Sequence, residues 1–375
     1  MFFKNARIFT SDFQFHHGAF EVIGDRFGAI LPESIPEDAI DLKGATVIPG
    51  LIDIHIHGSA YADASDGDRE GLQNMAAFLA SAGVTSFAPT TCTVSYEDLQ
   101  ASFIAAKQLH DALPQGCSRP LGIHMEGPYF NYNRKGGQNP DHLKAPDFPG
   151  FRALYEACGG FIRIVDVAPE LPGAIEFIRQ ASQLCTVSIA HTDATYEETL
   201  AGFAAGASHL THTFNAMTGI HHREPGVIPA AAENSNVRAE LICDGLHVHP
   251  ATVRLAFSIF GADRIVMVSD ALRCCGLPNG RYSIGGQDVT LQDGLARLDS
   301  GVIAGSATHL YDAMRRTIDA GTPEADVVRA ATYNPACAMG AEKEVGSIAT
   351  GLLADFLICS PDYTAKTVYM NGQPI

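Results

Sequence analysis

Eight short apolar segments recur through the middle of the chain, and they restrict its fold more than any other feature of the sequence. Their length and their content of β-branched residues are typical of buried parallel strands. Stretches with the periodicity of amphipathic helices, such as 69–82 and 97–110, separate them. Because a (β/α)8 barrel consists of eight such units, the pattern predicts an α/β fold of the TIM-barrel type. The segments are Val47–Ile56, Val84–Pro89, Leu121–Met125, Ile162–Ala168, Cys185–Ala190, Ser208–Leu210, Ala239–Cys243 and Ile265–Val268.

The two ends of the chain have a different pattern from the middle. Residues 1–49 contain short β-type segments interrupted by Gly, Pro and Asp, and residues 341–375 add two further such segments. We therefore expect residues 1–49 and 341–375 to form a small β-sandwich together, and residues 50–340 to form the barrel. The segment Gly280–Leu298 is predicted to be a hairpin inserted after the eighth strand.

Charge and composition exclude several classes of function. The net charge of −17 argues against nucleic acid or an anionic membrane as a partner, because phosphate groups require a basic surface. The chain has no apolar run of the length that a transmembrane helix needs, and its first residues do not resemble a secretion signal. The nine cysteines have neither disulfide nor metal spacing, so we expect reduced thiols and a cytoplasmic protein. An anionic small molecule is an allowed partner if the chain supplies a local positive site.

Polar residues that can bind a metal follow most of the predicted strands, at the point where each strand ends. Because the carboxyl ends of barrel strands face one common site, we expect these side chains to converge. Two of the histidines are two positions apart in the first strand, where successive side chains alternate between the two sides, so both point to the same side. The residues are His55, His57, Glu126, His191, His212 and Asp270, with His247 nearby.

Each of these residues alone has an ordinary structural explanation. Glu126 could cap a helix, for example, and Asp270 could be a turn residue. Together they require more, because charged and imidazole groups at the ends of apolar strands each cost desolvation free energy unless they are satisfied. A divalent cation would satisfy all of them, so the sequence predicts a metal site. Arg223, in a loop after the sixth strand, could meet an anionic substrate, although a lone loop arginine is usually solvated.

Several segments resemble a known family. The segment Pro49–Gly58 resembles the first-strand signature of the amidohydrolase superfamily. More narrowly, seven further segments, in the family's order, resemble the N-acetylglucosamine-6-phosphate deacetylases, and the resemblance spans essentially the whole chain. These segments are His124–Pro128, Ala190–Ala194, Thr211–Met217, Asp244–Val248, Ser269–Ala271, Ala304–Ser306 and Gly346–Ile348.

The resemblance implies roles for individual residues. Asp270 matches the family's catalytic acid and base. The positions for the main ion, Zn²⁺ or Fe²⁺, are Glu126, His191 and His212, and those for a second ion, present in some members, are His55 and His57. The substrate-binding positions are Gln138, Asn215, Ala216, Arg223, His247 and Ile303. In that family the arginine reaches into the neighbouring subunit's site, so the resemblance implies a homodimer.

The activity implied by the resemblance is metal-dependent hydrolysis of an amino-sugar phosphate. N-acetyl-D-glucosamine 6-phosphate would give D-glucosamine 6-phosphate and acetate, as a step of amino-sugar catabolism. Gln138 departs from the family pattern, because many members have a histidine at this position. An amide can still form hydrogen bonds, but it is not a proton donor near neutral pH. The choice between the gluco and galacto epimers therefore stays open.

Other classes of protein remain as alternatives. A cyclic-amide hydrolase similar to dihydroorotase would bridge two metals with a carboxylated lysine, but no lysine occurs between Lys144 and Lys343. Glu126 could take over that bridging role. A deaminase of nucleosides is disfavoured, because Glu126-Gly127-Pro128 is not typical of that class. A barrel without catalytic function, used as a binding protein, is expected to have lost its ligand positions, and all six are present.

Overall fold

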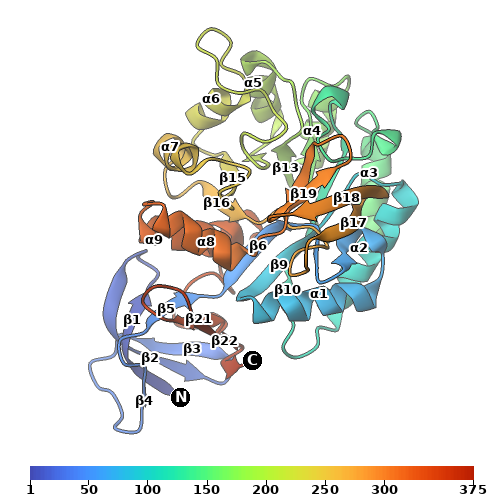
Figure 1. Ribbon diagram of the computed structural model, residues 1–375. Helices are drawn as coiled ribbons and strands as arrows, with labels where there is room; N and C mark the ends of the chain where they lie inside the picture. Colours follow the sequence, from blue (N-terminus) through green and yellow to red (C-terminus); the bar gives the residue numbers. More distant parts are fainter.

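The computed structural model describes residues 1–375, and its largest part is a parallel sheet that curls into a nearly closed barrel (Figure 1). The strands follow the order β10-β9-β11-β12-β13-β14-β15-β16, and β6 pairs with β9. Directly after β16, the backbone N–H of Asp270 donates to the carbonyl of His55 in β6 at 2.9 Å, which brings the last strand to the first. The predicted barrel is confirmed. Its strands are β6 (Leu51–Ile56), β9 (Val84–Thr91), β10 (Arg119–Pro120), β11 (Ile123–Tyr129), β12 (Ile162–Val167), β13 (Thr186–Ile189), β14 (His209–Leu210), β15 (Arg238–Ile242) and β16 (Ile265–Val268).

Helices cover the outside of the barrel (Figure 1). Capping residues define where several of them begin: the carboxylate of Asp68 accepts two backbone N–H groups at the start of α1, and Thr195 and Glu198 form a capping box on α5. None of the helices combines the length and the hydrophobicity that crossing a membrane would require. The helices are α1 (Arg69–Ser81), α2 (Tyr96–Asp111), α3 (Phe148–Ala157), α4 (Ala174–Ala181), α5 (Tyr196–Ala205), α6 (Val227–Glu233), α7 (Pro250–Phe260), α8 (Leu310–Asp319), α9 (Glu324–Ala331) and α10 (Tyr333–Ala338).

The first apolar segment, Val47–Ile56, was expected to be a single barrel strand, and the structure differs from this expectation. It divides into β5 (Thr46–Pro49), which pairs in the small terminal sheet, and β6, which pairs in the barrel. Pro49 has no N–H to donate to a sheet, and a side chain at Gly50 would collide with Thr85. The change of sheet therefore occurs at Pro49-Gly50.

The predicted hairpin over 280–298 is part of a larger antiparallel sheet. Its four strands are β17 (Gly280–Ile284), β18 (Gln287–Gln292), β19 (Leu295–Leu298) and β20 (Ile303–Ser306). The strand β20, which the hairpin prediction did not include, pairs with β19 and returns the chain to the end of the barrel. Short elements complete the loops: β7 (Gly58–Ser59), β8 (Ala62–Asp63) and the 3-10 helices η1 (Ala64–Asp66), η2 (Tyr132–Arg134) and η3 (Pro140–His142).

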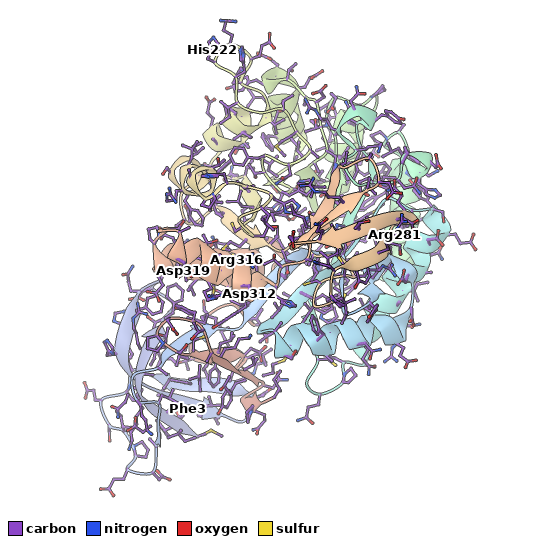
Figure 2. The ribbon with its side chains drawn as sticks, viewed as in Figure 1. Phe3, His222, Arg281, Asp312, Arg316 and Asp319 are labelled. Atoms are coloured by element: carbon purple, nitrogen blue, oxygen red, sulfur yellow. The ribbon has the colours of Figure 1, made fainter.

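Both ends of the chain contribute to one separate, largely antiparallel sheet, as expected. The C-terminal strand β21 lies between β22 and the N-terminal β5. Buried aromatic rings form the core of this sheet, where Phe3 (labelled in Figure 2) stacks on Phe20 with ring centroids 4.8 Å apart and meets Phe356 edge-on. Its strands are β1 (Phe2–Phe9), β2 (Phe15–Ile23), β3 (Arg26–Ile30), β4 (Ile40–Asp41), β5, β21 (Phe356–Cys359), β22 (Lys366–Met370) and β23 (Gln373–Pro374).

An ion pair joins the terminal sheet to the helices of the barrel. The guanidinium of Arg7 in β1 donates to both carboxylate oxygens of Glu324, at 2.8 and 2.6 Å. Glu324 begins α9 and also accepts a hydrogen bond of 2.7 Å from the hydroxyl of Tyr363. Burial would raise the pKa of Glu324, but the hydrogen bonds from Arg7 and Tyr363 lower it. The carboxylate is therefore ionised in the folded protein at neutral pH.

We expect Glu324→Gln to destabilise the protein by about 1–2 kcal/mol near neutral pH, the range for a hydrogen-bonded charge that retains partial exposure. Because the folded-state pKa of Glu324 is lowered, this contribution is present above the unfolded pKa and lost as the pH falls through the folded pKa. Urea unfolding at pH 7 and pH 3 measures both effects. Glu156→Gln is the control, because its pair with Arg152 is exposed on α3. Equal destabilisation by both variants would contradict the assignment.

Candidate active site

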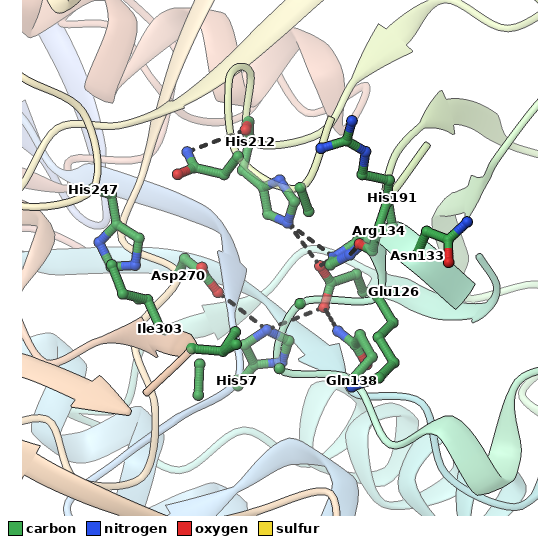
Figure 3. A pocket seen from close by; sticks show the side chains of 18 of the residues that line it. His57, Glu126, Asn133, Arg134, Gln138, His191, His212, His247, Asp270 and Ile303 are labelled. Carbon is green, nitrogen blue, oxygen red and sulfur yellow. Dashed lines mark hydrogen bonds and ion pairs between the residues drawn. The ribbon is translucent and has the colours of Figure 1, made fainter. Parts of the chain in front are cut away.

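The polar residues at the strand ends converge at one end of the barrel (Figure 3). They come from five strands that lie around the same axis, and all of their side chains are buried. The imidazoles and carboxylates that were predicted from separate sequence segments are therefore neighbours in space. Their positions are His55 in β6, His57 directly after it, Glu126 in β11, His191 after β13, His212 after β14 and Asp270 after β16.

Three of these residues have an unusual backbone conformation. His191, His212 and Asp270 have φ angles of 45°, 29° and 48°, in the left-handed region that residues with a side chain rarely adopt. Each follows the end of its strand, where the chain turns away from the sheet. Such strain persists where the surrounding structure enforces it, and it gathers at functional sites.

Glu126 forms the centre of the first cluster. Its Oε1 lies 3.0 Å from Nε2 of His191 and 3.1 Å from Nε2 of His212, and the two nitrogens are 3.1 Å apart. The Nδ1–H of His191 donates to the carbonyl of Arg134 at 2.8 Å, which leaves its Nε2 with a free lone pair. The ligand atoms of these three residues all lie within 4.8 Å of one another. A carboxylate with two imidazoles is a donor set that suits Zn²⁺ or Fe²⁺, so the residues fit a divalent ion.

A second cluster lies on the other side of the same carboxylate. Nε2 of His57 is 3.2 Å from Oε2 of Glu126 and 3.2 Å from Oδ1 of Asp270. Nε2 of His55 is 3.6 Å from a carboxylate oxygen of each acid and has no hydrogen-bond partner, although it is buried. His55, His57 and Glu126 therefore form a second group that could hold an ion, with Glu126 shared between both groups.

The electrostatics of the two carboxylates are set by these imidazoles. Burial would raise the pKa of Glu126, but the surrounding histidines hold it well below the usual range. Burial would also raise the pKa of Asp270, yet the hydrogen bond from His57 and the nearby imidazoles lower it. The pKa of His212 is raised instead: burial disfavours the charged imidazole, but Glu126 raises the pKa to about 9. Both carboxylates thus need compensating positive charge, which protons or a divalent ion can supply.

A pocket of about 450 Å³ opens over the two clusters. It is lined by His57, Glu126, His191, His212 and Asp270, together with all but one of the predicted substrate-binding residues. The members of the substrate set that line it are Gln138, Asn215, Ala216, His247 and Ile303. The structure therefore brings most of the predicted metal ligands and substrate-binding residues to one cavity.

Gln138 and His247 are held by the protein in different ways. The carbonyl oxygen of Gln138 accepts the backbone N–H of Thr93 at 2.7 Å, and its amide donates to Glu126. One N–H of that amide is left for a ligand. Nδ1 of His247 lies 2.7 Å from Oδ2 of Asp244, and its Nε2 is buried without a partner at the pocket wall.

Arg223 is the one predicted substrate-binding residue that does not line the pocket of its own chain. It is exposed in the loop that follows β14, and its guanidinium lies 2.7 Å from Nε2 of His222. Figure 2 shows His222 at the outer tip of this loop, far from the barrel axis. The role of Arg223 at a partner's site stays a prediction.

Two sets of site residues were missed by the sequence analysis. The loop around η2 adds Asn133, Arg134 and Lys135 to the pocket wall, directly after the segment that contains Glu126. The second is Glu240, which stands in the middle of β15 beneath the pocket and contacts two histidines of other strands. Glu240 could have been found from the sequence, because it is a charged residue inside an otherwise apolar segment, and burying a charge costs desolvation free energy.

Comparison with known proteins gives relatives along nearly the whole chain. It is 33% identical over 345 residues to an N-acetylgalactosamine-6-phosphate deacetylase of Escherichia coli O157:H7, covering 91% of this chain and 90% of the relative. It is 35% identical over 322 residues to an N-acetylglucosamine-6-phosphate deacetylase of Bacillus subtilis, covering 85% and 81%.

Solved structures and a family model agree with these relatives. A mutant N-acetyl-D-glucosamine-6-phosphate deacetylase of Mycobacterium smegmatis, in complex with N-acetyl-D-glucosamine-6-phosphate, superposes with a TM-score of 0.94 at 31% identity, covering 100% of this chain and 98% of that one. The enzyme of Pasteurella multocida gives a TM-score of 0.93 at 28% identity, with 100% and 99% coverage. The model of the amidohydrolase family matches residues 46–375. The chain therefore belongs to the amidohydrolase family.

Proposed function

We propose that this chain hydrolyses the acetamide of N-acetyl-D-glucosamine 6-phosphate, releasing D-glucosamine 6-phosphate and acetate, as a step of amino-sugar catabolism. The observation that carries the proposal is the position of Glu126 between two pairs of imidazoles, with Asp270 across the same pocket. The deacetylases among the relatives supply the substrate class. The nine free cysteines fit a reducing compartment, so we place the reaction in the cytoplasm.

The proposed ligands of the main ion, Zn²⁺ or Fe²⁺, are Glu126, His191 and His212, and His55 and His57 would complete a second position. When bound, the ion would polarise the acetyl carbonyl and lower the pKa of a water molecule to about 7. The protein's part is to hold the imidazoles with their lone pairs facing inward, as the hydrogen bond from His191 to Arg134 does.

Asp270 is proposed to move the protons. Its carboxylate is buried, it faces the pocket, and its lowered pKa keeps it unprotonated before the reaction. It accepts a proton from water as the water oxygen bonds to the acetyl carbon. It then returns that proton to the nitrogen as the carbon–nitrogen bond breaks, so that acetate and the free amine leave. No serine or cysteine nucleophile is needed for this sequence of steps.

Substrate binding is assigned to the pocket residues other than the proposed ion ligands and Asp270. With both ring nitrogens protonated, His247 can donate Nδ1–H to Asp244 and Nε2–H to a phosphate oxygen. The side chain of Asn215 and the backbone of Ala216 would contact the same group. The free N–H of Gln138 and the side chain of Ile303 would contact the sugar. In a homodimer, Arg223 of each chain would reach the phosphate in its partner's pocket.

The galacto epimer is a second candidate substrate, because one relative is an N-acetylgalactosamine-6-phosphate deacetylase at 33% identity. Both sugars present the same acetamide and the same phosphate. Acetate release measured on both 6-phosphates, and on both sugars without phosphate, tests the activity and decides between the epimers. Absence of acetate release from all four compounds would exclude the deacetylase function.

The first prediction from the proposed function concerns the metal. Purified protein should contain at least one divalent transition-metal ion per chain, and its removal by a chelator should abolish acetate release until Zn²⁺ or Fe²⁺ is restored. His191→Ala should lose this ion, because it removes one of three ligands. His16→Ala is the control, since this histidine lies in the terminal sheet. Elemental analysis and activity measure the outcome; full activity in metal-free protein would refute the assignment.

The second prediction concerns Asp270. Asp270→Asn keeps the size of the side chain but removes its basic oxygen, so kcat should fall about 10²–10⁴-fold, as expected for a general acid and base. Metal content should not change, because the main ligands are untouched. Steady-state kinetics with elemental analysis test this, and near-normal turnover in the variant would assign the proton transfers to another group.

The third prediction concerns the phosphate. Arg223→Ala should lower kcat/KM for the phosphorylated sugar by the equivalent of about 1.5–3 kcal/mol, the usual size for a hydrogen bond to a charged group. The unphosphorylated sugar should be almost unaffected. Arg281→Ala, an exposed arginine in β17 outside the pocket, is the control. Equal losses on both substrates would contradict a phosphate role.

A mixing experiment tests whether Arg223 acts across a dimer. Neither the Arg223→Ala protein nor the Asp270→Asn protein has an intact site of its own. If the arginine acts across the interface, each mixed dimer has one site with both residues, and mixing should restore activity. No recovery, once subunit exchange has been verified, would show that the site is not shared.

A further inference from the structure

Glu240 lies beneath the candidate active site and has not been assigned a role above. It stands in the middle of β15, it is fully buried, and it does not line the pocket. Its carboxylate accepts hydrogen bonds from two imidazoles: Oε2 lies 2.9 Å from Nδ1 of His55, and Oε1 lies 3.0 Å from Nε2 of His209. Oε2 also accepts a longer hydrogen bond, of 3.4 Å, from the backbone N–H of His212. His55 belongs to the proposed second ion position.

The hydrogen bond to Glu240 determines which nitrogen of His55 can bind an ion. Since a carboxylate only accepts, Nδ1 of His55 must carry the proton, and the lone pair is then on Nε2. That nitrogen faces Glu126 and Asp270 at 3.6 Å and has no hydrogen-bond partner. An imidazole that bonds a carboxylate through one nitrogen and presents the other is the usual arrangement of a metal-binding histidine.

His57 is oriented by a different set of contacts. Its Nδ1 lies 3.1 Å from the carbonyl of Thr90 and 3.3 Å from Sγ of Cys92, so the nitrogen that faces away from the ion position is not held by a carboxylate. His55 has no such backbone partner for Nδ1, and Glu240 is its only hydrogen-bond acceptor. The two histidines of the second ion position thus differ in the hydrogen-bond partner of Nδ1.

We propose that Glu240 is a positioning residue that makes His55 a metal ligand and so determines whether the chain holds a second divalent ion. This inference rests on the proposed function, since it assumes the ion positions assigned there. The carboxylate acts through the imidazole of His55 and does not line the substrate pocket; its contact with His212 is a long hydrogen bond to the backbone, and it leaves that imidazole untouched. Removing it should therefore weaken the second ion and leave the first one in place.

Asp166 provides a matched control for the alternative that Glu240 only stabilises the fold. It is also fully buried, in β12, and its Oδ1 accepts hydrogen bonds from His124 at 2.9 Å and from Thr211 at 3.0 Å. Neither partner lines the pocket. Asp166→Asn thus removes a fully buried carboxylate of another barrel strand without changing the acceptor of His55.

The experiment counts ions in the wild-type protein, Glu240→Leu and Asp166→Asn after loading with Zn²⁺, and titrates each protein with Zn²⁺ by calorimetry. We expect two ions per chain in the wild type and in Asp166→Asn. In Glu240→Leu the affinity for the second ion should fall about 10–100-fold, the usual effect of removing such a partner, while the first ion keeps its affinity. Leucine is close to glutamate in size but cannot accept a hydrogen bond.

Glu240→Gln gives a second measurement and serves if Glu240→Leu does not fold. Its single amide oxygen must serve two imidazole donors, so the second-ion affinity should lie between those of the wild type and the leucine variant. Unchanged second-ion affinity in the variants that fold, or a single ion in the wild type, would overturn the inference. Failure of the proposed function has a different signature: two ions are bound, but no acetate is released from either sugar phosphate.

Discussion

Two carboxylates and four imidazoles are buried together at one end of an apolar barrel, and the rest of the structure accommodates this concentration of charge. Removing an ionised group from water costs several kcal/mol unless other charges and hydrogen bonds compensate. Glu126 is only 1% exposed, and its compensation comes from histidines on three other strands. Because each partner belongs to a different strand, the charges are balanced only when the barrel is assembled. The site is therefore complete only in the assembled barrel.

The geometry of the site also depends on strain that the barrel core supports. The left-handed backbone of His191, His212 and Asp270 costs of order 1–3 kcal/mol at each position. Each turn follows a buried strand, and the three residues are themselves buried, so the surrounding packing holds the imidazoles and the carboxylate in their directions toward Glu126. Stability is thus exchanged for a fixed arrangement of reacting groups, which electrostatic catalysis requires.

The barrel and the polar residues of the site could be predicted from the sequence because both depend on local patterns. Short apolar strands with a polar residue at the end are visible in a window of a few residues, as in the segment that ends with His55 and His57. What was missed depends on distant partners. The break at Pro49-Gly50 is decided by pairing of β5 with β21 near the other end of the chain. The role of Glu240 depends on a histidine 185 positions away, which no local pattern contains.

The order of strands in the terminal sheet has a consequence for the protein during its synthesis. β5 is paired on one side by β1, but its other side is covered by β21. While the ribosome is still producing the barrel, residues 356–359 do not yet exist, and β5 presents a row of free backbone groups to the cell. Open strand edges pair readily with other chains. The nascent chain is thus exposed to aggregation at this edge until β21 has been made and pairs with β5.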